Sequence, residues 1–313
     1  MASLHSWYVS DQGRFSVAHI AARTLRKRFA TVWAELKAAC GRMQNAEHVH
    51  QLRVATRRTL AAMEAFADLL PPKKQIWFTK RLRRIRRAAS DARDLDVLTD
   101  RLAGVTETST MVPRSPAARK ARGRLVAMLS RQRIVSREPI REIYEQLVED
   151  DWHGRLEHML EGIAARRRQP LFTVYARERF RPFVERFFAK ADRKLRDEHE
   201  IHDLRIEGKQ LRYALEIFAG VFPVETRRSC QDALEELQRT LGEFTDHAAA
   251  ADRFRRWSRD DGVHSDRDTL DALRKQEVAL ANRARKAFAK WWSPARRRTL
   301  RRVFERSLRR DPA

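Results

Sequence analysis

The sequence predicts an all-α protein built from two related helical bundles around a basic groove or channel. Apolar residues recur with helical period along most of the chain, and no stretch shows the alternation typical of a strand. Glycine and proline are scarce, at 10 each among 313 residues, which favours helix. Residues 50–101 also align without a gap with residues 202–253, and 13 of these 52 pairs are identical. A repeat of this length indicates an internal duplication.

The first predicted bundle covers residues 14–160. Within this range, Gly104–Pro116 is rich in Thr, Ser and Pro, which predicts a loop. The helices expected on either side of that loop are His19–Ala39, Val49–Leu69, Lys73–Asp100, Ala117–Ile134 and Ile140–Leu160.

The second predicted bundle covers residues 170–310, and Gly162–Pro170 is expected to join it to the first. Pro182 falls inside a helical pattern and should kink or restart that helix. The helices expected here are Leu171–His199, His202–Phe218, Thr226–Asp260, Asp268–Trp292 and Ala295–Leu308.

Charge is the strongest compositional feature. The formal net charge is +24 and the pI is about 11.1, which favours polyanionic partners such as nucleic acid, acidic membrane or polyphosphate. A nonspecific basic protein is the alternative, and charge alone does not exclude it. Cys40 and Cys230 suggest free thiols in a reducing compartment. The N-terminus lacks the pattern of a signal peptide, and no apolar run is long enough to span a membrane. These features predict a cytoplasmic protein without a membrane partner.

A basic motif occurs twice, as HQLRVATRR from His50 and as HDLRIEGKQLRY from His202. On a helix, each copy places its large apolar residues on one face and its basic residues on another. Leu60 stands where the second copy has its fourth basic residue, so the first face is poorer by one charge. The motif residues are His50, Arg53, Arg57, Arg58, His202, Arg205, Lys209 and Arg212.

A solvated surface is the alternative interpretation of one such helix. Two copies at equal spacing instead suggest matching faces that hold one polyanion. Glu64 and Glu216 follow the motifs and end the basic faces, and Glu216 is placed to pair with Arg212 four residues earlier.

Together, HxxRVxxRR, HxLRIxxKxLRYALExF and SDARDLDVL make the chain resemble the CHAD family, the conserved histidine α-helical domain, over residues 14–310. The resemblance implies two similar bundles around a basic channel, binding of inorganic polyphosphate and association with polyphosphate granules. It implies the eight motif residues as contacts, with Arg87 and Arg239 behind them. Gln210 departs from the usual pattern, and the ExExK signature of the triphosphatase domain found in many relatives does not occur.

Polyphosphate suits such a site chemically, because arginine binds phosphate through forked, charge-assisted hydrogen bonds. His50 and His202 would donate if a bound polyanion raised their pKa. Their alternative roles are helix capping and orientation of the next arginine.

Two other functions compete with this hypothesis. Nonspecific nucleic-acid binding at low salt follows from the charge, although Ser10–Leu25 resembles a helix-turn-helix only weakly. A metal-dependent enzyme would need more than His48, His50, His199 and His202, since no HExxH motif, cysteine pair or P-loop accompanies them. We therefore expect a binding protein with no catalytic residues, metal or cofactor.

Overall fold

The computed structural model describes residues 15–41, 46–103, 115–165, 170–193, 195, 197–259 and 267–309. These residues are helical almost throughout, which confirms the predicted all-α class. Their single β interaction is an isolated bridge between Ser16 and Leu171. Within the described ranges, no helix has both the length and the apolar character needed to cross a membrane.

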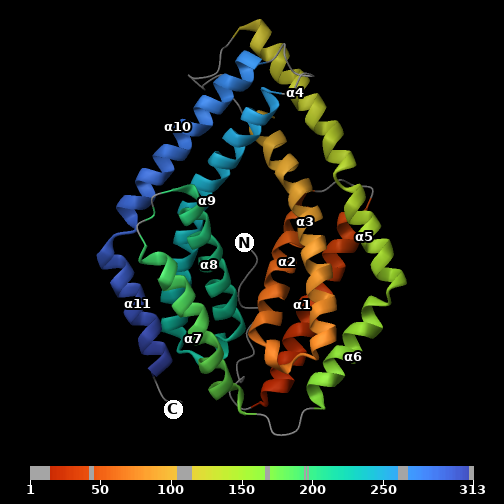
Figure 1. The fold of residues 1–313 in the computed structure, drawn as a ribbon, viewed down its shortest axis with the longest axis vertical. Coiled ribbons are helices and arrows are strands. Elements are labelled where there is room, and N and C mark those ends of the chain that lie inside the picture. The colour runs from red at the N-terminus through yellow and green to blue at the C-terminus, as the bar shows by residue number, and fades with distance from the viewer. Residues whose placement is uncertain are drawn as a thin grey trace.

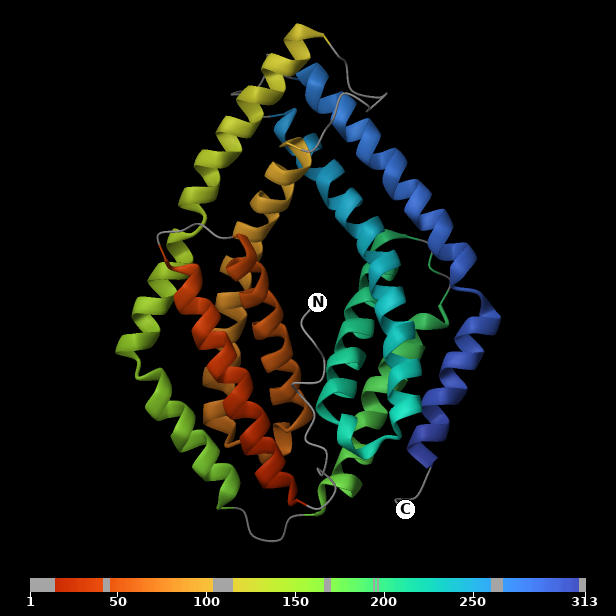
Figure 2. The ribbon, with the colours of Figure 1, turned by 180° about the vertical axis from the view of Figure 1, so that it is seen from behind.

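Two groups of helices stand side by side and give the molecule a diamond-shaped outline (Figures 1 and 2). Helices α4 and α10 run toward the apex along the two upper edges. The first group contains α1 (Val17–Ala39), α2 (Ala46–Ala65), α3 (Pro72–Ala103), α5 (Glu138–Glu149) and α6 (Trp152–Ala164). The second contains α7 (Phe172–Ala191), α8 (Glu198–Ile217), α9 (Val224–Trp257) and α11 (Pro294–Arg309). The apical pair is α4 (Pro116–Val135) and α10 (Arg267–Trp291).

The helix boundaries follow the 152-residue offset seen in the sequence. Helix α2 and helix α8 begin and end at equivalent positions, and α3 and α9 begin at the equivalent residues Pro72 and Val224, each directly after a proline. The intervening 3-10 helices, η3 (Ala67–Leu69) and η4 (Ala219–Val221), also correspond. In the first group α2 packs between α1 and α3, and in the second α8 packs between α7 and α9.

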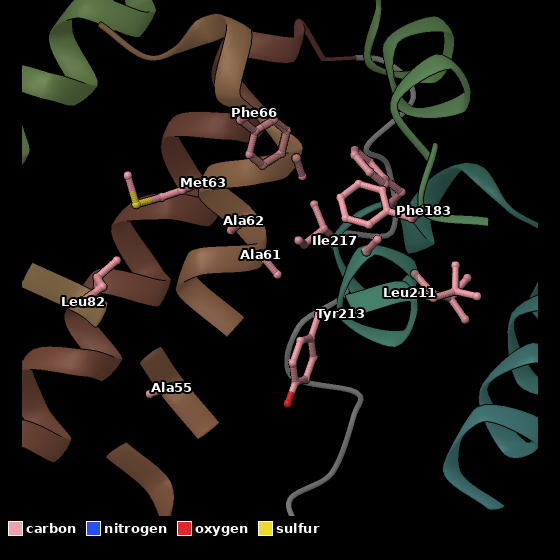
Figure 3. Close-up of a cluster of buried hydrophobic side chains, with 14 of the residues drawn as sticks. Ala55, Ala61, Ala62, Met63, Phe66, Leu82, Phe183, Leu211, Tyr213 and Ile217 are labelled. Atoms are coloured by element: carbon pink, nitrogen blue, oxygen red, sulfur yellow. The ribbon is translucent and has the colours of Figure 1, made fainter. Parts of the chain in front are cut away.

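A continuous apolar core extends through both groups. Figure 3 shows Ala61 and Ala62 of α2 turned toward Ile217 of α8. Such small side chains let the two helices lie close together, and the rings of Phe66 and Phe218 meet at 6.1 Å. Burying each phenylalanine stabilises the fold by about 1.5–3 kcal/mol, so the contact between the groups is part of the core.

A second, smaller core lies at the apex, where α3 and α9 converge with α4 and α10 (Figure 1). It is made by Leu98, Leu102, Leu125, Leu129, Ala250, Phe254, Trp257, Leu270 and Leu273. The long helices α3 and α9 therefore belong to both cores, and they frame the space between the two groups.

The predicted helix Ile140–Leu160 is wrong, because the chain turns between α5 and α6. Asp151 has φ 52°, and its Oδ1 accepts a hydrogen bond from Gly154 N at 3.1 Å. This side chain caps α6 and brings Trp152 into the core at 1% exposure. Continuous helical period in the sequence concealed the turn, since apolar residues on both sides still reach the core.

The predicted helix Leu171–His199 is also too long. Helix α7 ends at Ala191, and Asp197 caps the start of α8 by accepting from Glu200 N at 2.9 Å. Helix α7 continues through Pro182 without restarting. Within the two predicted connections, 104–114 and 166–169 lie outside the described residues, as does 10–14 of the segment resembling a helix-turn-helix.

Candidate anion-binding cleft

The apolar faces of α2 and α8 determine where the basic motifs point. Each helix buries the residues predicted to face inward, with exposures of 5% or less. The opposite flank of each helix then turns toward the space between the two groups. The buried residues are Leu52, Thr59 and Met63 of α2 with Phe66 directly after it, and Leu204, Leu211 and Leu215 of α8 with Phe218 directly after it.

A cleft of about 640 Å³ lies between α2, α3, α8 and α9. Among the described residues, nine arginines and Lys209 line it, against three carboxylates, Asp94, Asp246 and Asp252. An excess of positive charge on facing walls is the electrostatic requirement for holding an anion. The cations are Arg53, Arg57, Arg93, Arg101, Arg205, Lys209, Arg212, Arg239, Arg253 and Arg256.

Many lining residues come in pairs separated by 152 positions, one from each half of the chain. Arg53 lies 3.7 Å from Asp94, and Arg205 lies 3.7 Å from Asp246. Four further pairs line the cleft, namely Arg57 with Lys209, Arg101 with Arg253, Val97 with Ala249 and Leu98 with Ala250. Both halves thus present similar chemistry to the same space.

Burial and like charge strongly perturb the cations of this cleft. Burial, followed by the repulsion of Arg205, Arg57 and Arg53, lowers the pKa of Lys209 to about 6. Burial and the repulsion of Arg57 lower the pKa of Arg53 to about 10, although Asp94 opposes the shift. Burial also lowers the pKa of Arg205. The free cleft therefore holds more positive charge than its own carboxylates offset.

The two motif histidines occupy different positions. His50 lines the cleft, and burial together with Arg93 lowers its pKa. His202 lies on an exposed part of α8 outside the cleft lining. Burial of its ring and the nearby Arg205 lower its pKa as well. Both shifts favour neutral imidazoles at neutral pH in the absence of a ligand.

Arg58 and Arg212, one from each motif, contact the same buried glutamate, Glu216. The predicted pairing of Arg212 with Glu216 is confirmed, at 3.6 Å. Arg58 approaches the same carboxylate at 3.2 Å from α2, and Arg28 approaches it at 3.4 Å from α1. Arg212 still lines the cleft, whereas Arg58 lies at the contact between the two helix groups.

Arg87 and Arg239 differ although they occupy equivalent positions. Arg239 lines the cleft but forms ion pairs with Glu236 and Glu243, each at 2.7 Å. Arg87 lies on an exposed face of α3 outside the cleft lining. Seven of the ten predicted site residues therefore meet at the cleft, and Arg58, Arg87 and His202 lie beside it.

Sequence reasoning missed four cations of the cleft: Arg93, Arg101, Arg253 and Arg256. A signal was present for one pair, because Arg101 and Arg253 are identical positions of the repeat. Arg101 is held by Glu277 of α10 at 2.6 Å. In the part of the chain that the structure describes, no three His, Cys, Asp or Glu side chains gather as a metal site would require.

Comparison with curated proteins finds no match. Among solved structures, the CHAD domain from the plant Ricinus communis is similar, with a TM-score of 0.68, 20% identity, and coverage of 94% of this chain and 93% of that one. PptA from Streptomyces chartreusis is similar with a TM-score of 0.53, 16% identity, and coverage of 89% and 99%. At such identities the likeness shows the fold. The family model for the CHAD domain matches residues 23–255, and the chain therefore belongs to the CHAD domain family.

Proposed function

We propose that this protein binds inorganic polyphosphate in the cleft between α2, α3, α8 and α9. The observation that carries the proposal is the charge of the described lining, nine arginines and Lys209 against three carboxylates, contributed by both halves of the chain. Nine of those cations are arginines, whose planar forks match phosphate oxygens better than a point charge does. The expectation of polyphosphate itself comes from the resemblance to the CHAD family.

The chemistry of the lining favours polyphosphate over nucleic acid. Proteins that bind single strands stack bases on aromatic side chains, whereas the described lining of the cleft contains no Phe or Trp and a single Tyr, Tyr213, at 3% exposure. A chain of phosphates needs no such platform. It needs a high density of donors, which the facing walls supply.

The paired residues support a proposed internal duplication, with repeats at 14–160 and 170–310 forming one functional unit around a basic channel. Equal 3.7 Å separations in Arg53–Asp94 and Arg205–Asp246 are what two descendants of one unit would retain. We assign the protein a binding role rather than an enzymatic one, in the cytoplasm and in association with polyphosphate granules.

Nonspecific binding of nucleic acid is the second candidate, and the net charge of +24 supports it. Such binding depends on counterion release and weakens steeply with salt. A cleft with partly buried cations should keep its ligand better than an exposed basic surface does, because buried charges are screened less.

The deciding experiment compares affinity for long-chain polyphosphate and for duplex DNA at ~0.15 M salt, where exposed charges are substantially screened. We expect polyphosphate to bind at least about tenfold more tightly, a difference of ~1.4 kcal/mol. Equal or tighter binding of DNA would reject polyphosphate as the specific ligand. Release of phosphate on incubation with polyphosphate and divalent metal would overturn the non-enzymatic role.

A further inference from the structure

Helix α3 carries a second set of basic residues outside the cleft. Lys80, Arg83, Arg84 and Arg87 are exposed and follow the spacing i, i+3, i+4 and i+7, so they form one stripe along the helix. They line a groove of about 720 Å³ on the outer side of α3. None of the described residues that line this groove is acidic.

A smaller groove connects this stripe with the cleft side of α3. It has a volume of about 320 Å³, lies between α2, α3 and α8, and shares Gln75, Thr79 and Arg83 with the outer groove. Its lining also includes Arg86 and Gln210. The Oε1 atom of Gln210 is buried without a hydrogen-bond partner.

Arg86 is the link between the grooves and the cleft. Burial lowers its pKa, and the repulsion of Arg57, Arg83 and Arg87 lowers it further. Arg57 lines the cleft, whereas Arg83 and Arg87 line the outer groove. Positive charge is therefore continuous from the cleft wall, past Arg86, to the stripe on α3. Glu64 is the one acidic residue in the described lining of the smaller groove, and Arg186 pairs with it at 2.7 Å.

The equivalent face of α9 has the opposite character. At the five positions that correspond to Lys80, Arg83, Arg84, Arg86 and Arg87, the second half has Asp232, Glu235, Glu236, Gln238 and Arg239. The one remaining cation, Arg239, is paired with Glu236 and Glu243. A polyanion that extends out of the cleft thus meets five cations over α3 and three carboxylates over α9.

We infer that a polyphosphate chain too long for the cleft leaves it over α3, where Arg86 and the stripe of Lys80, Arg83, Arg84 and Arg87 form a second binding subsite. This inference rests on the proposed function of the cleft. A bound chain then extends out of the cleft on one side only, because the α3 flank accepts phosphate and the α9 flank does not. It also makes affinity depend on chain length, since short chains reach only the cleft.

The test measures affinity across a series from tripolyphosphate to long-chain polyphosphate, for the full-length protein. The variant Arg83→Glu with Arg87→Glu reverses two charges of the stripe. Its matched control, Arg298→Glu with Arg302→Glu, makes the same change at the same spacing on exposed positions of α11. Helical circular dichroism and the thermal midpoint establish that both variants are folded.

We expect the α3 variant to lose about tenfold in affinity for long chains, the scale of a few exposed charge contacts, and to bind tripolyphosphate as the wild type does. The control should lose clearly less for long chains. If the two variants weaken long chains equally while the wild type binds polyphosphate, the α3 subsite is wrong and the cleft proposal stands. If the wild type binds no member of the series, the proposed function itself fails.

A reciprocal variant tests the direction independently. Asp232→Arg with Glu235→Arg places cations on the flank of α9 that we infer to be closed, and it keeps Glu236, the partner of the cleft residue Arg239. Long-chain affinity should then rise several-fold with no change for tripolyphosphate. An unchanged long-chain affinity would show that the acidic flank does not direct the chain.

Discussion

Arg28 lies 3.4 Å from Glu216, and only 4% and 5% of the two side chains are exposed. The pair joins α1 of the first helix group to α8 of the second, inside the contact between them. Arg58 and Arg212 approach the same carboxylate. A single buried glutamate therefore stabilises three arginines, one of which lines the cleft, and its charge couples the packing of the two groups to the geometry of the site.

Replacing Glu216 by glutamine should destabilise the fold by about 3–5 kcal/mol, the usual cost of removing one member of a buried ion pair. The amide keeps the volume but removes the carboxylate charge that lies 3.4 Å from Arg28. Urea unfolding followed by circular dichroism measures the loss. The control is Glu64→Gln at the equivalent position of the repeat, where the carboxylate is exposed and pairs with Arg186; there we expect about 1 kcal/mol or less. Equal losses in the two variants would contradict a special role for Glu216.

Reversing the two equivalent arginines of the cleft, Arg53→Glu with Arg205→Glu, should abolish most polyphosphate binding. Hydrogen bonds to charged groups contribute about 1.5–3 kcal/mol each, so the double variant should lose at least about a hundredfold in affinity. The exposed pair Arg298→Glu with Arg302→Glu serves as the control for total charge. Retained affinity in a folded double variant would show that α2 and α8 do not form the site.

Removing the carboxylates of the cleft should have the opposite effect. Asp94 and Asp246 each lie 3.7 Å from a motif arginine, and burial raises the pKa of Asp94. The variant Asp94→Asn with Asp246→Asn frees Arg53 and Arg205 for phosphate, and we expect a several-fold gain in affinity. Isothermal titration calorimetry distinguishes this from a positioning role, in which the same variant would bind more weakly than the wild type.

The helical faces were predictable because they depend on local spacing. Leu52 and Leu204 occupy equivalent places in equivalent helices, and both are fully buried as the period predicts. The turn at Asp151 was not predictable from period, since Ile140–Leu160 keeps its apolar spacing across the break. Aspartate is a favoured N-cap residue, but the unbroken apolar spacing around Asp151 gave no sign that a new helix begins there.

The site residues that could be predicted are those whose orientation follows from the faces of a single helix. Arg53 and Arg205 follow from the faces of α2 and α8, whereas Arg101 and Arg253 reach the cleft because α3 and α9 converge toward the apex. That convergence is a property of the whole fold. The contact of Arg58 with Glu216, 158 residues away, likewise depends on how the two groups pack.

Lys209 should make polyphosphate binding dependent on pH. In the free protein its pKa is lowered to about 6, first by burial and then by Arg205, Arg57 and Arg53. A bound polyanion favours the charged ammonium and raises that pKa. At a pH between the pKa of Lys209 in the free protein and its pKa in the complex, the complex holds more protons than the free protein. Affinity for polyphosphate is therefore highest below about pH 6 and falls as the pH rises from the lower pKa to the higher one.

Calorimetry at about pH 7.5, in buffers with different ionisation enthalpies, measures the expected uptake of up to about one proton per site. Lys209→Arg should bind polyphosphate with much less uptake of protons, because guanidinium stays charged across this range.

Lys209→Met should also take up fewer protons, and it should raise the unfolding free energy at neutral pH by about 1 kcal/mol or more, since one pKa unit corresponds to ~1.4 kcal/mol. The sign follows from linkage: above pH 6 the unfolded chain keeps a proton on Lys209 that the folded chain gives up, so folding carries a cost that methionine removes. Proton uptake in both variants equal to that of the wild type would assign the pH dependence to other groups, of which His50 is the nearest candidate within the cleft lining, because its pKa is also lowered by burial and by Arg93.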